Sequence, residues 1–163
     1  MVGEMTDQPR SNRAARPNRR IVLLGGVGAA TVVAVYSLSS MVAPATELSL
    51  TPDEAHQHAT AQEILLIDIR RPDEWDLTGI GQGAVPLDMR RDDFTSALRE
   101  LAGGDLGRPI ALICARGVRS RRQSAQMIEA GFTQIIDIPE GMLGSGSGPG
   151  WLARGLPIYP YES

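Results

Sequence analysis

The sequence predicts an α/β fold with a parallel central sheet, helices on both faces of it, and one hydrophobic helix ahead of it at the N-terminus. The first observation is that strand-like and helix-like stretches alternate from residue 51 to residue 138, as in a parallel sheet covered on both faces. The second is that the runs 64–69 and 109–113 are almost wholly apolar, which is typical of strands buried on both sides. The third is that residues 21–43 carry no charge.

The elements of the body are predicted from start signals, apolar spacing and glycine stops. Thr51-Pro52-Asp53-Glu54 combines a threonine cap, proline in the first turn and glutamate three residues after the cap, so it starts a helix. Trp75 is expected to pack inward from a short helical turn. The predicted helices cover 51–59, 72–76, 92–101 and 120–130, and the predicted strands cover 64–69, 84–87, 109–113 and 134–138.

The N-terminal part predicts a membrane or export segment. As a helix, the uncharged stretch 21–43 would span roughly 34 Å at about 1.5 Å per residue, enough for a bilayer core of about 30 Å. Five arginines in residues 1–20 keep that end cytoplasmic by the positive-inside rule. The predicted organisation is therefore an Arg-rich region 1–20, an anchor or signal segment 21–43, a linker 44–50 and a domain 51–160.

Two versions of this segment stay open. It is either a retained single-pass anchor, or a signal peptide cleaved after Ala45 in the small-x-small pattern Ala43-Pro44-Ala45. Asn18-Arg19-Arg20 loosely resembles a twin-arginine export signal. Every version places the domain on the extracytoplasmic (periplasmic) side, either held at the cell membrane or exported and cleaved.

Composition excludes several classes of function. The single cysteine rules out an intrachain disulfide, a thiolate zinc cluster and a CxxC redox pair. The net charge of −3 becomes −6 once the first 20 residues are set aside, so we expect no nucleic-acid partner. His56 and His58 stand two apart on a predicted helix and point in different directions, so no metal site is predicted.

Cys114 ends an apolar strand and precedes a short turn and a helix, and it is the predicted catalytic residue. Backbone N–H groups of the turn and the positive end of the helix dipole favour a thiolate there. Gly117 suits a turn that curls around an anion, and the arginine forks of Arg116 and Arg119 suit oxyanions. Val118 and Ser120 complete the predicted substrate-binding turn. Asp68 either orients this turn from the neighbouring strand or caps local backbone.

The run from Cys114 to Ser120 resembles the C-x-x-G-x-R-S active-site loop of single-domain rhodaneses. Residues 66–75 resemble the family's first strand and the turn after it, and 79–86 resemble its GHIPGA region, with Ile80 where the family usually has histidine. Residues 139–158 resemble its C-terminal end, with a longer and more glycine-rich segment at 141–150. That segment is either a mobile lid over Cys114 or a plain flexible loop. The four stretches follow the family's order over roughly residues 48–160.

The resemblance implies a rhodanese-type sulfurtransferase that needs no cofactor. The Cys114 thiolate would take the outer sulfur of a small anionic donor such as thiosulfate and pass it to an external thiol or cyanide, since the chain holds no second cysteine. Two alternatives remain: a non-catalytic redox-sensing or sulfur-binding module, and a cysteine-based phosphatase or arsenate reductase. The C-x4-R spacing from Cys114 to Arg119 is one residue shorter than the C-x5-R loop of the related phosphatases.

Overall fold

The computed structural model describes residues 48–162. A five-stranded parallel sheet has the order β1-β6-β5-β2-β4, and a two-stranded antiparallel ribbon pairs β3 with β7. The strands are β1 (Leu48–Ser49), β2 (Leu65–Asp68), β3 (Ile80–Gly81), β4 (Ala84–Pro86), β5 (Ile110–Ile113), β6 (Ile135–Asp137) and β7 (Ile158–Tyr159). The helices are α2 (Pro52–Thr60), α3 (Pro72–Thr78), α4 (Phe94–Leu101), α5 (Val118–Glu129) and α6 (Gly150–Ala153).

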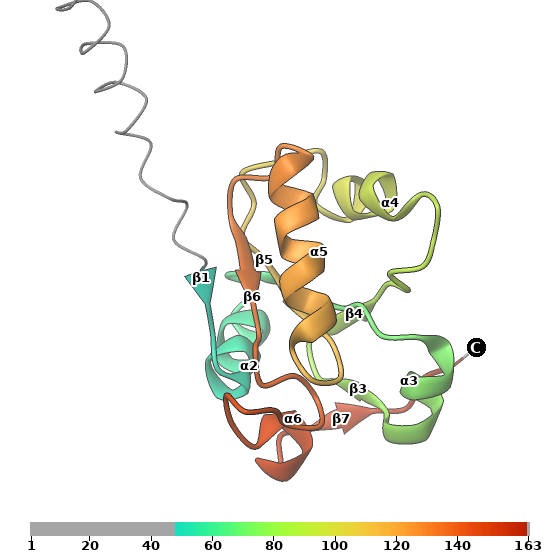
Figure 1. The fold of residues 1–163 in the computed structure, drawn as a ribbon, viewed down its shortest axis with the longest axis vertical. Helices are drawn as coiled ribbons and strands as arrows, with labels where there is room; N and C mark the ends of the chain where they lie inside the picture. The colour runs from blue at the N-terminus through green and yellow to red at the C-terminus, as the bar shows by residue number, and fades with distance from the viewer. Residues whose placement is uncertain (1–47, 163) are drawn as a thin grey trace, which may run out of the picture. The chain divides into compact units, whose positions relative to one another are not determined.

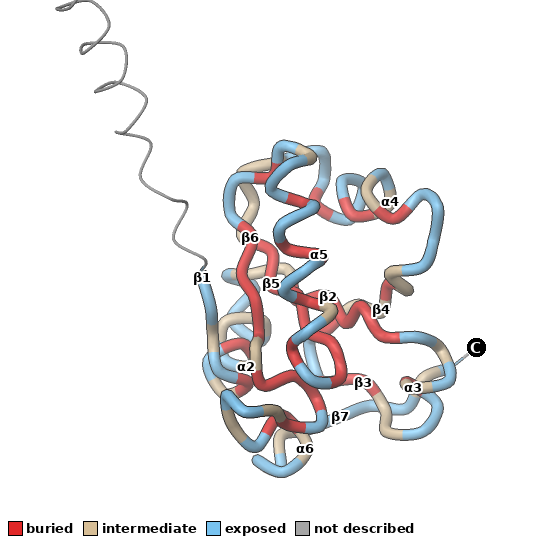
Figure 2. The backbone as a smooth tube through the Cα atoms, viewed as in Figure 1, coloured by how far each residue is buried: buried red, intermediate tan, exposed pale blue. Residues whose placement is uncertain are grey.

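Two separate apolar layers confirm that helices cover both faces of the parallel sheet. Alternate residues of a strand point to opposite faces, and β5 follows this rule. Ile110 and Leu112 pack with α4 and α5, whereas Ala111 and Ile113 pack with α2, α3 and α6. All four residues of β5 are buried, as its red colour shows (Figure 2), so the strand that leads to Cys114 runs through the centre of the core.

Most predicted elements are present, with shifted ends. The capping box of α2 is confirmed, since the Thr51 hydroxyl accepts from the Glu54 N–H and the Glu54 carboxylate accepts from the Thr51 N–H. Trp75 is buried, as expected. Helix α3 is longer than the single turn predicted, and α5 begins at Val118 rather than at residue 120. Part of the predicted linker is a strand, because β1 pairs with β6.

The predicted N-terminal region 1–20 and the segment 21–43 lie outside the described residues. Within residues 48–162, no helix is both long and apolar enough to cross a membrane.

Candidate active site

The turn after β5 places the only cysteine against the start of α5. Figure 1 shows β5 leading to α5 at the end of the sheet where α3, β3, α6 and β7 gather. Cys114 is 1% exposed and packs in the layer of α4 and α5. The Gly117 N–H donates to the Cys114 Sγ across 3.1 Å. A main-chain donor aimed at the sulfur stabilises negative charge on it, and the N-terminus of α5 adds to this effect.

Gly117 is required by both its backbone angle and its surroundings. It precedes α5 in the left-handed region, with φ of 79°. A Cβ at this position would lie 2.1 Å from the Pro139 carbonyl oxygen, far closer than a carbon and an oxygen can approach. Glycine therefore permits the turn both to reverse around the sulfur and to lie directly on the chain that leaves β6.

Arg119 is held by a carboxylate from another helix. Its two terminal nitrogens donate to the two oxygens of Glu74 at 2.6 and 2.7 Å, a bidentate pair. The Arg119 hydrogen bond lowers the pKa of Glu74. The pKa of Arg119 is raised, first by this bond and to a lesser extent by Cys114. Arg119 thus stands beside the sulfur as a fixed positive charge.

Glu74 received no role in the sequence analysis. It lies in the first turn of α3, where its carboxylate also accepts from the Arg71 N–H at 3.1 Å. From the sequence, a glutamate two residues after Pro72 is fully explained by this capping bond at the start of the helix, so it suggests no further role. Nothing in the sequence marks its second partner, 45 residues away.

Asp68 lies at the end of β2, next to β5, and its carboxylate is engaged with Arg70. The Asp68 and Arg70 side chains are 0% and 1% exposed, and the guanidinium donates to both carboxylate oxygens at 2.7–2.9 Å. Arg70 also donates to the Thr78 hydroxyl and the Gly79 carbonyl, so it joins β2 to the C-terminal end of α3. This buried network holds α3 in place, and α3 carries the Glu74 side chain that binds Arg119.

The other predicted turn residues divide into inward and outward groups. The buried Ser120 hydroxyl donates to the Gly117 carbonyl at 3.1 Å and so closes the turn. Val118 is 70% exposed. Arg116 is also exposed, and one of its nitrogens donates to the Gly144 carbonyl at 3.4 Å. The structure therefore brings Gly117 and Arg119 toward the sulfur and leaves Arg116 and Val118 facing outward.

The glycine-rich segment 141–150 is hydrogen-bonded to the turn that begins at Cys114. The Met142 and Leu143 N–H groups donate to the Cys114 and Ala115 carbonyls, each at 2.9 Å. The segment is closed at its base by Glu140, whose buried carboxylate accepts from the Gly150 N–H and from Arg154. Arg154 also lowers the pKa of Glu140. The segment thus supports the turn from behind through main-chain bonds.

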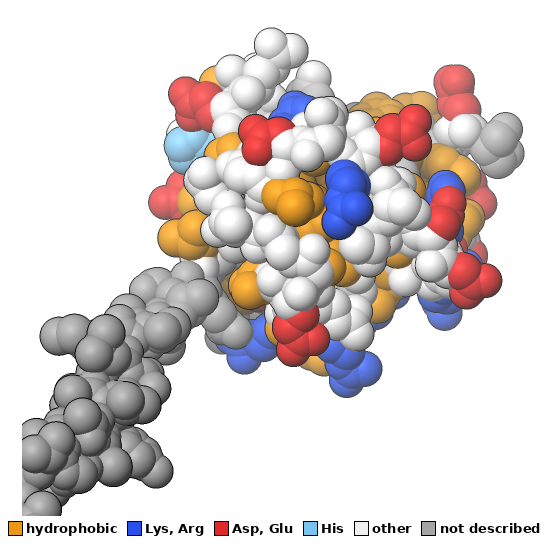
Figure 3. All heavy atoms as spheres, turned by 90° about the horizontal axis from the view of Figure 1, so that it is seen from above, with side chains coloured by type: hydrophobic (Ala, Val, Ile, Leu, Met, Phe, Trp, Pro, Cys, Tyr) orange, Lys and Arg blue, Asp and Glu red, His pale blue; other side chains and the backbone are white. Residues whose placement is uncertain are grey.

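Charges on the outside of the molecule are mixed. Several arginines pair with acids two residues away in the chain, as Arg90 does with Asp88 and Arg91 with Asp93. The face seen in Figure 3 carries red and blue side chains interspersed with hydrophobic ones.

Comparison with solved structures shows the fold. The polysulfide-sulfur transferase homodimer of Wolinella succinogenes is 24% identical, with a TM-score of 0.55 over 82% of this chain and 93% of that one. The thiosulfate sulfurtransferase of Pseudomonas aeruginosa is 22% identical, with a TM-score of 0.56 over 71% of this chain and 21% of that one.

Curated relatives match by sequence over part of their length. The tRNA uridine(34) hydroxylase of Legionella pneumophila is 27% identical over 95 residues, 58% of this chain. The enzyme of the same name from Chlamydia pneumoniae is 23% identical over 110 residues, 64% of this chain. The matched portions are 37% and 34% of those proteins, so the chain spans little more than a third of their length.

The profile of the rhodanese-like domain matches residues 51–144, which include β2, β5, the turn from Cys114 to Arg119 and the start of the glycine-rich segment. This match covers more than half of the chain and agrees with the resemblance seen in the sequence. The chain belongs to the rhodanese-like domain family.

Proposed function

We propose that this protein is a sulfurtransferase that moves a sulfane sulfur from an anionic donor such as thiosulfate, through a persulfide on Cys114, to an external thiol. Membership of the rhodanese-like family supports sulfur transfer as the general chemistry. The observation that carries the specific proposal is the Gly117 N–H at 3.1 Å from the Cys114 Sγ, inside a six-residue turn that also holds Arg119.

In the first step, the Cys114 thiolate attacks the outer sulfur of thiosulfate. A bond forms between the two sulfurs, the S–S bond of the donor breaks, and sulfite leaves with the electron pair. The main-chain N–H groups at the start of α5 and the Arg119 guanidinium offset the negative charge that passes through the turn. Two displacements of this kind replace one difficult transfer.

In the second step, an acceptor thiolate attacks the outer sulfur of the persulfide. The Cys114 Sγ leaves with the electron pair and returns to the thiolate. The acceptor is external because Cys114 is the only cysteine of the chain. We assign Asp68 a positioning part in this scheme, because its carboxylate is bonded to Arg70 and orients α3 and Glu74.

The test is one round of the first step with purified full-length protein. Thiosulfate is expected to release one equivalent of sulfite and to add the mass of one sulfur atom to the chain, removable by a reductant. Cys114→Ser is expected to release none. Sulfite release by that variant, or turnover of a phosphate ester by the wild type, would refute the proposal. A chain that is oxidised at Cys114 but releases no sulfite would favour the redox-sensing alternative.

We further propose that the domain acts outside the cytoplasm. The segment 21–43 either anchors it to the membrane or is cleaved off as a signal peptide. The support is the uncharged length of that segment and the arginines before it.

A further inference from the structure

A small cavity borders the turn that follows Cys114. Its volume is about 280 Å³. One wall is the turn itself, at residues 116–118, and the opposite wall is the glycine-rich segment, at residues 145–147. Arg121 of α5 and Asp137 of β6 also line it. This volume is below the roughly 300–1,000 Å³ of pockets for drug-sized ligands, so it suits a short chemical group rather than a large molecule.

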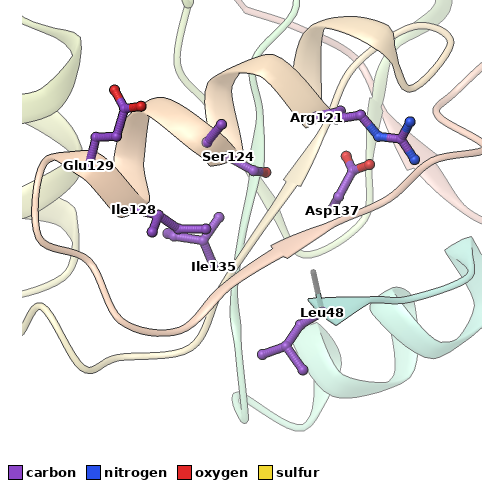
Figure 4. Close-up of a pocket in the computed structure, with 8 residues that line it drawn as sticks. Leu48, Arg121, Ser124, Ile128, Glu129, Ile135 and Asp137 are labelled. Atoms are coloured by element: carbon purple, nitrogen blue, oxygen red, sulfur yellow. The ribbon is translucent and has the colours of Figure 1, made fainter. Parts of the chain in front are cut away.

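The charges around this cavity favour an anion. Two arginines, Arg116 and Arg121, face it against one acid, Asp137. Figure 4 shows Arg121 and Asp137 pointing toward each other from α5 and β6, at one end of a neighbouring cavity of about 260 Å³ that both also line. Arg116 is exposed and makes a bond of 3.4 Å to the Gly144 carbonyl. Its guanidinium fork is the natural partner of a carboxylate that enters the cavity.

The far wall is held in place by its own hydrogen bonds. The Ser145 hydroxyl donates to the Pro139 carbonyl at 2.8 Å, and the Ser147 N–H donates to the Ser145 oxygen at 3.1 Å. Pro139 is the residue whose carbonyl lies against Gly117. The wall and the catalytic turn therefore meet at one residue, and a group in the cavity would lie next to the turn.

We propose that this cavity holds the anionic tail of the acceptor, and that the acceptor is a small thiol that carries a carboxylate. The inference rests on the proposed sulfurtransferase function. The acceptor's sulfur attacks the outer persulfide sulfur and takes it, the bond to the Cys114 Sγ breaks, and the electron pair returns to that Sγ. The carboxylate meanwhile lies beside Arg116, outside the turn.

Gly146 offers a substitution that tests charge alone. A Cβ at Gly146 would meet nothing within 4 Å, and this glycine does not have a left-handed backbone angle. Gly146→Asp and Gly146→Lys therefore place a negative or a positive charge in the wall, and Gly146→Asn is the neutral control that matches aspartate in shape.

The experiment uses full-length protein loaded with persulfide by thiosulfate, freed of donor and mixed with three thiols. These are 3-mercaptopropionate, neutral 2-mercaptoethanol and cationic cysteamine, each rate corrected for its thiolate fraction. The readout is the rate ratio of 3-mercaptopropionate to cysteamine within each variant, so general effects on folding or loading cancel. Gly146→Asp is expected to lower this ratio about tenfold relative to Gly146→Asn, and Gly146→Lys to raise it, with smaller differences at high salt.

Equal ratios in the Asp, Asn and Lys variants would overturn the inference, and so would a wild-type preference for cysteamine. Either result would leave the proposed function intact, because the persulfide would still form and be discharged. Absence of any persulfide after thiosulfate treatment would instead refute the proposed function itself.

Discussion

Replacing Gly117 with alanine tests whether the turn depends on its contact with the chain after β6. The left-handed angle of 79° costs a non-glycine residue about 1–2 kcal/mol. The new Cβ would also start 2.1 Å from the Pro139 oxygen, whereas ordinary contact begins at 3.4 Å, so the backbone must move by more than 1 Å. Overpacking of this kind costs a further 1–3 kcal/mol or so.

Gly103 supplies a matched control for that variant. Its φ is 72°, yet a Cβ there would meet nothing within 4 Å. Gly103→Ala therefore carries the angular cost without the collision. By differential scanning calorimetry we expect a fall in Tm of roughly 4–8 °C for Gly103→Ala and roughly 8–20 °C for Gly117→Ala, at about 4 °C per kcal/mol for a domain of this size.

The catalytic effect of Gly117→Ala should be at least as clear. Displacement of the Gly117 N–H removes its 3.1 Å bond to the sulfur. A hydrogen bond to a charged group contributes about 1.5–3 kcal/mol, which corresponds to a loss of roughly 10- to 150-fold in the rate of sulfite release. This reasoning would be refuted if Gly117→Ala had the same Tm as Gly103→Ala and released sulfite within about twofold of the wild-type rate.

The remaining predictions concern the two glutamates and the N-terminal segment. Glu74→Gln should lower the free energy of unfolding by about 1 kcal/mol in urea titrations. The value is small because the Glu74 and Arg119 side chains are 19% and 32% exposed. The same variant should slow sulfite release, and an unchanged rate would show that Arg119 does not need Glu74 to hold it in place. Because the pKa of Glu74 is lower in the folded protein than in the unfolded chain, its stabilising effect should be complete above about pH 4.3 and disappear as the pH falls through the folded value. Stability curves of wild type and Glu74→Gln should therefore converge in acid, and a constant gap down to the lowest pH would contradict this. Glu140→Gln should lower the free energy of unfolding by about 3 kcal/mol, because the Glu140 side chain is only 4% exposed. It should also speed hydrogen exchange at the Met142 and Leu143 amides. Unaltered exchange at these amides would mean that segment 141–150 keeps its conformation without the Glu140 carboxylate. Protease added to spheroplasts should degrade the domain, and recovery of intact protein from the cytosol alone would exclude export.

Local signals in the sequence predicted local structure well. The Thr51–Glu54 capping box and the apolar runs of β2 and β5 depend on neighbours within a few residues, and both are present. The position of Cys114 at the end of a buried strand followed from the same patterns. The expected start of α5 at residue 120 was two residues late, because Gly117 begins the helix without a side-chain cap, so no capping residue marked the boundary.

Features that depend on distant partners were missed. Strands β1, β3 and β7 have two residues each, too few for any alternation to be visible, and they exist only because another strand pairs with them. Glu74 was missed for the same reason, since its bond to Arg119 spans 45 residues. The role of segment 141–150 also stayed open, because main-chain bonds such as that from Met142 to Cys114 leave no mark in side-chain chemistry.

The Gly117 N–H, a main-chain group, donates to the sulfur, whereas the side chains of Arg116 and Val118 point outward. Every residue contributes the same peptide group to the main chain. We therefore expect substitutions at positions 116 and 118 to change which molecules bind while the main-chain hydrogen bond to the sulfur is kept. In the proposed sulfurtransferase, main-chain atoms of the turn would govern reactivity and its outward side chains would govern selectivity. For protein engineering, this makes the turn a place where new acceptors can be selected from libraries of two positions, with Cys114, Gly117 and Arg119 left constant.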